Sequence, residues 1–145
     1  MLHYGLVLTL HLLAAIAFAG TVFFEVIMLE GVRRHLPAET MRAVEQAIGH
    51  RAVRIMPFVL LLLYGAGITL AWQYRAALAA PLSNHFAALL SLKIVLAISV
   101  FGHFLTVMVW RRKGRLNGRR SRRLHYSVFV HVILIVLLAK GMFYL

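Results

Sequence analysis

The chain has 145 residues, of which 62% are hydrophobic, and a formal net charge of +12. The apolar content exceeds the roughly 45–50% of ordinary soluble domains, so the composition excludes a typical soluble protein and predicts one membrane domain covering residues 1–145. The absence of cysteine excludes disulfides, thiolate metal sites and cysteine nucleophiles. We find no internal repeat and no low-complexity tract.

Four apolar segments are long enough to cross a bilayer, which requires about 20 residues of helix. In chain order these segments are residues 4–29, 56–74, 86–110 and 125–145. Between the first two, residues 38–55 follow Pro37 and carry apolar residues near helical spacing, which predicts an amphipathic helix along the inner membrane surface, either separate from the second segment or continuing into it. The sequence therefore predicts an all-α, integral membrane four-helix bundle.

The connections between these segments differ sharply in positive charge. The first carries five arginines, the third carries eight Lys and Arg residues between Arg111 and Arg123, and the second carries only Arg75. The positive-inside rule then places the first and third connections in the cytoplasm and both termini outside, in the periplasm. We expect a multi-pass protein of the bacterial inner membrane that is surrounded by lipid. No aromatic residue interrupts the basic segment and no folded domain surrounds it, so we expect no nucleic-acid partner.

Ionisable side chains at membrane depth are costly and usually face the interior of a bundle. His11 lies in the first segment, His103 in the third and His131 in the fourth. Counted from the inner ends of their segments at about 1.5 Å per residue, His103 and His131 both lie roughly 9–11 Å deep. Two imidazoles at one depth on neighbouring helices can bind a planar metal complex between them, and haem b is the cofactor usually bound by such a pair. A hydrogen bond to the next helix is the alternative for each histidine.

Several stretches resemble a family of small membrane proteins. "LHLLAAIAFAGTVFFEVIML" (residues 10–29) is similar to the first span of copper-resistance-D-like proteins and of HemJ-type protoporphyrinogen oxidases, with a family histidine at the place of His11. "LKIVLAISVFGHF" (92–104) resembles the third HemJ span and matches its lysine and histidine to Lys93 and His103. "RAVRIMPFVLLLLYGAGITLAW" (51–72) and "LLAKGMFYL" (137–145) are similar to the second and last spans. The resemblance implies a four-helix membrane bundle that binds haem b, with Lys93 among its cofactor-binding residues.

The chain departs from HemJ in two motifs. It lacks the Pro-Arg that follows the first HemJ span and the Asn-Glu-x-Pro that begins the last one, and His131 has no HemJ counterpart. The copper-resistance-like branch is therefore the nearer relative.

These observations lead to three functional hypotheses. The first is electron transfer by a haem b with His103 and His131 as axial ligands, in a homodimer or beside a redox partner protein, because four short helices form a thin shell. The second is copper transport or resistance, with metal capture by His11 and the outward-facing histidines. The third is HemJ-like protoporphyrinogen IX oxidation, which needs a second tetrapyrrole pocket and a quinone as electron outlet. A purely structural or assembly role is a further alternative.

Overall fold

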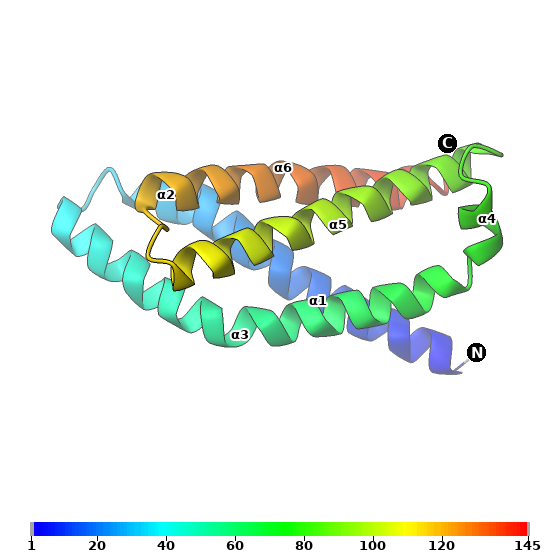
Figure 1. Ribbon diagram of the computed structural model, residues 1–145, viewed down its shortest axis with the longest axis horizontal. Helices are drawn as coiled ribbons and strands as arrows, with labels where there is room; N and C mark the ends of the chain where they lie inside the picture. The colour runs from blue at the N-terminus through cyan, green and yellow to red at the C-terminus, as the bar shows by residue number, and fades with distance from the viewer. Residues whose placement is uncertain (1, 145) are drawn as a thin grey trace. The chain divides into compact units, whose positions relative to one another are not determined.

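The computed structural model describes residues 2–144, and all regular structure within this range is helical. The chain divides into two compact units, Met1–Gln73 and Tyr74–Leu145. Each unit is built on two long antiparallel helices that pack against each other, α1 with α3 and α5 with α6 (Figure 1). These four helices are α1 (Leu2–Phe23), α3 (Ala38–Trp72), α5 (His85–Arg112) and α6 (Gly118–Gly141).

In the first unit, the first span is helical throughout but not uniformly α-helical. Helix α1 passes directly into a π-helical segment, η1 (Phe24–Leu29), and then into the short α2 (Glu30–Val32). After a turn, α3 begins behind Pro37 and continues without a break through Pro57. The surface helix predicted for residues 38–55 is thus the first part of α3 and not a separate element. Pro57 lies in the interior of α3, where it removes one backbone N–H and its ring crowds the carbonyl four residues earlier, and the helix nevertheless continues on both sides of it.

The second unit begins with the short α4 (Arg75–Ala79), which was not predicted, and continues into the α5–α6 hairpin. Asn84 precedes α5, and its side-chain oxygen accepts a hydrogen bond from the backbone N–H of Ala87 (2.8 Å). Asn117 caps α6 in the same way, with the N–H of Arg120 at 2.9 Å. Such caps satisfy backbone donors that have no partner inside the helix. Because of this cap, α6 starts well before the predicted residue 125.

Within residues 2–144, four helices are long and apolar enough to cross a membrane: His3–Val32, Ala38–Trp72, His85–Arg112 and Gly118–Gly141. Large apolar side chains on all four remain exposed, and Ile16, Leu61, Ile98 and Leu137 are between 62% and 73% exposed. Such surfaces are costly in water and favourable in lipid. The structure therefore confirms an all-helical chain with the composition of a multi-pass membrane protein.

A cluster of charged side chains joins α2 to α3 in the first unit. Nε of Arg33 donates to Glu30 at 3.1 Å, and Nη2 of the same arginine donates to Glu45. Partial burial by itself would lower the pKa of Arg33, but the two carboxylates outweigh it and raise that pKa above its ordinary value. The guanidinium therefore stays charged and ties the end of the first span to the start of α3.

A candidate site of paired histidines between α5 and α6

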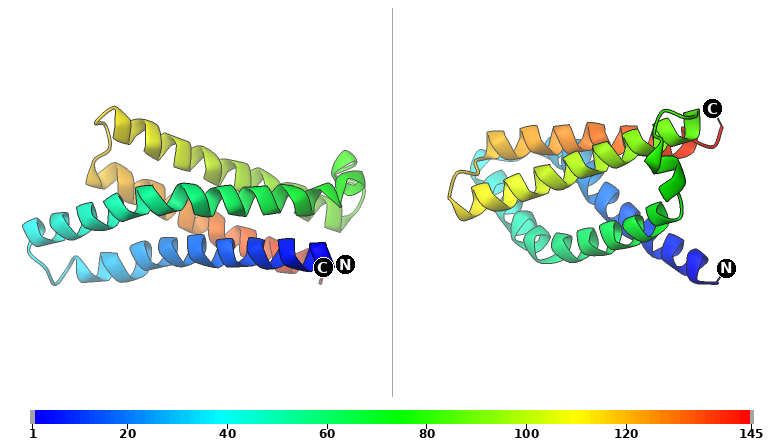
Figure 2. Two further views of the ribbon diagram at one scale, coloured as in Figure 1. Left: turned by 90° about the horizontal axis from the view of Figure 1, so that it is seen from below. Right: turned by 45° about the vertical axis from the view of Figure 1, so that its right-hand side comes forward.

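The two histidines predicted to lie at equal depth meet in the second unit, where α5 and α6 run side by side (Figure 2). The ring centres of His103 and His131 are 5.2 Å apart, and their planes are inclined by 60°. Both rings are partly buried between the helices. The structure thus brings His103 and His131 together.

Both imidazoles are held by serines through four hydrogen bonds. Nδ1 of His103 donates to the carbonyl oxygen of Ser99 (2.7 Å), and its Nε2 accepts from the hydroxyl of Ser127 (2.8 Å). Nδ1 of His131 donates to the carbonyl oxygen of Ser127 (2.7 Å), and its Nε2 accepts from the hydroxyl of Ser99 (3.0 Å). The four bonds form a closed ring, which we call the His–Ser ring, and every imidazole nitrogen in it has a partner.

The His–Ser ring arises from a short repeat in the sequence. Residues 99–103 read "SVFGH" and residues 127–131 read "SVFVH". A spacing of four places each serine and histidine on one face of its helix, and antiparallel packing lets each serine reach the histidine of the other copy. The valines of both copies, Val100 and Val128, are buried. The expectation that the chain has no internal repeat is therefore wrong at this scale, and the repeated Ser-Val-Phe-x-His was the signal that identifies the two serines.

The hydrogen bonds fix the tautomer of both rings. A carbonyl oxygen only accepts, so Nδ1 of His103 and of His131 must carry the proton, and the lone pair of each neutral ring lies on Nε2. Imidazoles that bind metals are commonly oriented in this way, with the second ring nitrogen donating to a carbonyl. Each Nε2 is thus a nitrogen donor suited to haem iron or another transition metal.

The His–Ser ring fits the haem hypothesis in the chemistry of its donor atoms but not in the joint placement of its two imidazoles. The donor chemistry fits, because both Nε2 lone pairs are set by a carbonyl bond at Nδ1. The joint placement does not offer a shared iron as it stands, because the two Nε2 lone pairs are occupied by two different hydroxyls, Ser127 on α6 for His103 and Ser99 on α5 for His131. Ligation by one imidazole displaces a single serine hydroxyl, whereas ligation of one iron by both displaces the two hydroxyls.

His11 belongs to the first unit, where it contacts α3. Its Nδ1 lies 3.0 Å from the carbonyl oxygen of Leu63, so this nitrogen also carries the proton. Gly67 lies directly against the ring: a methyl group built there would be 3.1 Å from Cε1 of His11. The interhelical hydrogen bond anticipated for a membrane histidine is thus present at His11, and its role as a ligand stays a prediction.

The close approach at Gly67 gives a test of how tightly His11 is packed. Gly67→Ala is expected to displace the His11 ring and, relative to Gly65→Ala with the same gain in helix propensity, to lower the free energy of unfolding by about 1–3 kcal/mol, since the added methyl group overpacks the contact. The measurement is denaturant or thermal unfolding of the purified protein in detergent. Gly65→Ala is the matched control, because nothing lies within 4 Å of a methyl group at that position. Equal stability of the two variants would contradict the packing described.

Lys93 does not join the paired histidines. It lies on α5, ten residues before His103, which corresponds to about 15 Å along the helix axis. Its side chain is partly buried. The cofactor-binding role implied for Lys93 by the family resemblance stays a prediction, at some distance from the His–Ser ring.

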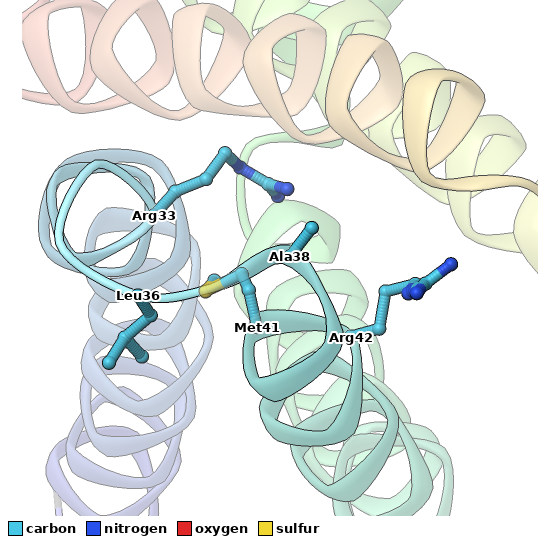
Figure 3. A pocket seen from close by; sticks show the side chains of 5 residues that line it. All are labelled: Arg33, Leu36, Ala38, Met41 and Arg42. Atoms are coloured by element: carbon cyan, nitrogen blue, oxygen red, sulfur yellow. The ribbon is translucent and has the colours of Figure 1, made fainter.

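An open pocket lies at the turn between α2 and α3. Figure 3 shows its lining: Met41 is turned toward the segment that carries Leu36, whereas Arg42 extends outward. Because Arg33 is already bound by two carboxylates, this pocket adds no donor to the chemistry above. Among residues 2–144, no group of three or more His, Cys, Asp or Glu side chains is placed to hold a metal ion.

Comparisons of the chain with protein-family models, with curated proteins and with solved structures find no match.

Proposed function

We propose that this chain is a multi-pass membrane protein that binds haem b through Nε2 of His103 or of His131 and transfers electrons. One observation carries the proposal: the carbonyl bonds at Nδ1 direct both Nε2 lone pairs into the contact between two helices that are long and apolar enough to cross a membrane. Haem, when bound, supplies a one-electron iron couple whose potential depends on its axial ligand and on the burial of the site. The chain supplies the ligand and its orientation.

The surroundings of the His–Ser ring support this role in two ways. A serine released from Nε2 can bond the carbonyl four residues earlier on its own helix, so metal ligation leaves no polar group stranded. Beside His103, a methyl group built on Gly102 would meet nothing within 4 Å, so the surface of α5 is open next to the ligand. A macrocycle edge fits against such a surface.

The proposal extends to location and partners. We infer that the protein lies in a bacterial inner membrane with the Arg111–Arg123 connection in the cytoplasm and both termini in the periplasm, because positive charge concentrates on that side. The two helices of the α5–α6 hairpin would cover only a small part of the surface of a haem bound beside them. A second copy of the chain or a redox partner protein therefore completes its shell.

A second candidate function follows from the closure of the His–Ser ring. Four bonds that satisfy every imidazole nitrogen also describe a helix–helix clasp, in which the histidines only join α5 to α6. The chain would then have a structural or assembly role. Copper transport and protoporphyrinogen oxidation gain no supporting observation from residues 2–144.

The absorption spectrum of the detergent-purified protein, oxidised and then dithionite-reduced, separates the two candidates. The protein is produced with ample haem, and metals are analysed in the same sample. Sharp reduced α and β bands with iron near one per chain are expected for haem b. A featureless visible spectrum would overturn the haem proposal and leave the clasp, and bound copper without a porphyrin spectrum would point to metal handling instead.

A further inference from the structure

A dense group of positive charges lies where α5 ends and α6 begins. We define the basic segment as residues 111–123, which contain eight Lys and Arg residues and no acidic residue. All eight side chains are exposed. They are Arg111, Arg112, Lys113, Arg115, Arg119, Arg120, Arg122 and Arg123.

The chain itself cannot neutralise the basic segment. It has only four acidic residues, and all of them lie between residues 25 and 45. Two of these, Glu30 and Glu45, are bound to Arg33. At most Glu25 and Glu39 remain, so acidic side chains of this chain can pair with at most two of the eight positive charges.

The turn between the helices holds these charges close together. Arg120 donates through Nη1 to the carbonyl oxygen of Arg115 (2.8 Å), and its guanidinium lies 5.3 Å from the centre of the Trp110 ring. This cation–π contact and the Asn117 cap give the connection a defined shape. The first turn of α6 contains no acidic residue, and the partial positive charge of its amino end adds to that of the arginines.

The basic segment also borders an apolar surface. Leu105 and Val109, about two turns and one turn before the end of α5, are 47% and 46% exposed. Tryptophan is typical of the interface between lipid tails and headgroups, and Trp110 stands at this boundary. If α5 crosses a membrane, this boundary predicts that the positive side chains beyond Trp110 lie at the level of the lipid phosphates.

We propose that the basic segment binds the phosphate headgroups of anionic phospholipids in the leaflet that it faces. The proposal is independent of any haem. Near a membrane surface each Lys or Arg strengthens binding to anionic lipid roughly five-fold, which is the equivalent of about 1 kcal/mol. Because the contacts between these side chains and the lipid phosphates are exposed to solvent, added salt weakens them.

The test is the retention of lipid by purified protein exchanged into mixed phosphatidylcholine and phosphatidylglycerol, measured by native mass spectrometry at low and high salt. The wild type is expected to retain phosphatidylglycerol at least about five-fold over phosphatidylcholine at low salt, with the preference reduced at high salt. Equal retention of the two lipids by the wild type overturns the proposal whatever the variants do. Inorganic phosphate is added in a separate arm, and displacement of the lipid by phosphate at equal concentration would assign the segment to soluble anions instead.

Two variants with equal loss of charge locate the binding. The first combines Arg112→Gln, Lys113→Gln, Arg119→Gln and Arg123→Gln, and keeps Arg120 and the cap intact. The second changes four exposed arginines of the other connection, Arg34, Arg42, Arg51 and Arg54, to glutamine. The first is expected to lose the preference for phosphatidylglycerol about ten-fold or more, and the second to retain most of it. Equal losses would mean that net charge and not the basic segment holds the lipid.

Discussion

His103→Ala or His131→Ala is expected to abolish or shift the haem spectrum, whereas Ser99→Ala and Ser127→Ala are expected to preserve it. The reason lies in the direction of the bonds: a histidine variant removes an Nε2 lone pair, and a serine variant only removes the hydroxyl that occupies it. The measurement is the dithionite-reduced spectrum of each purified variant, with the haem content per chain. The histidine whose loss changes the spectrum is the ligand.

Each serine variant is also a matched control for stability. Ser127→Ala and His103→Ala both remove one interhelical bond, and bonds of this kind in membrane proteins contribute on average about 0.6 and at most about 1.7 kcal/mol. Their double variant is expected to cost less than the sum of the two, because they share that bond. If serine and histidine variants lose similar stability and both retain the wild-type spectrum, neither imidazole is the ligand and the His–Ser ring is a clasp.

The meeting of His103 with His131 was anticipated from helical rise and a short connection. The equal count of residues to the inner ends depends on where those ends are placed: from the observed ends, His103 lies nine residues before Arg112 and His131 lies 13 residues after Gly118, so the antiparallel register of α5 and α6, and not an equal count, brings the rings together. The direction in which each imidazole ring points could not be predicted from a count of residues. It depends on Ser99 and Ser127, which hydropathy treats as neutral positions and which matter only once the register of α5 against α6 is known.

The ends of the helices, too, could be predicted only in part. Residues 118–124 were left outside the predicted last span because five of them are charged or polar. A hydropathy pattern does not detect a helix of that composition. Arginine is nonetheless a good helix former, and Asn117 supplies a cap, so α6 begins at Gly118. In α3 the pattern left two possibilities open, a separate amphipathic helix or one that continues into the span, and the structure has a single helix from Ala38 to Trp72.

His11 was singled out because it lies within the first apolar segment, and the family resemblance adds a histidine at that place, whereas the role of Lys93 was inferred from the resemblance alone. His11 satisfies its Nδ1 on the carbonyl of Leu63, a contact that no periodicity in the sequence specifies. Lys93 shares α5 with His103 but lies several turns away. A pattern of spaced residues along one helix therefore places two groups in order without placing them in contact.

A cysteine introduced at Lys113 is expected to be labelled only from the cytoplasmic side of the membrane, and one introduced at Ser83 only from the periplasmic side. The eight positive charges of the basic segment are far harder to translocate than the single Arg75 near Ser83. Both positions are exposed, and the chain has no cysteine of its own, so Lys113→Cys and Ser83→Cys each carry one thiol. A membrane-impermeant maleimide applied to spheroplasts and to inverted vesicles measures the side.

Total labelling after detergent solubilisation is the control for thiol reactivity at each site. Labelling of both thiols from one side would mean that α5 does not cross the membrane, and opposite labelling in the reversed sense would contradict the positive-inside assignment. The result also bears on the histidines, because it fixes which leaflet lies nearer to the His–Ser ring. With the basic segment inside, His103 and His131 lie in the cytoplasmic half of the bilayer, and an electron arriving at them from the periplasm must cross more than half of the membrane.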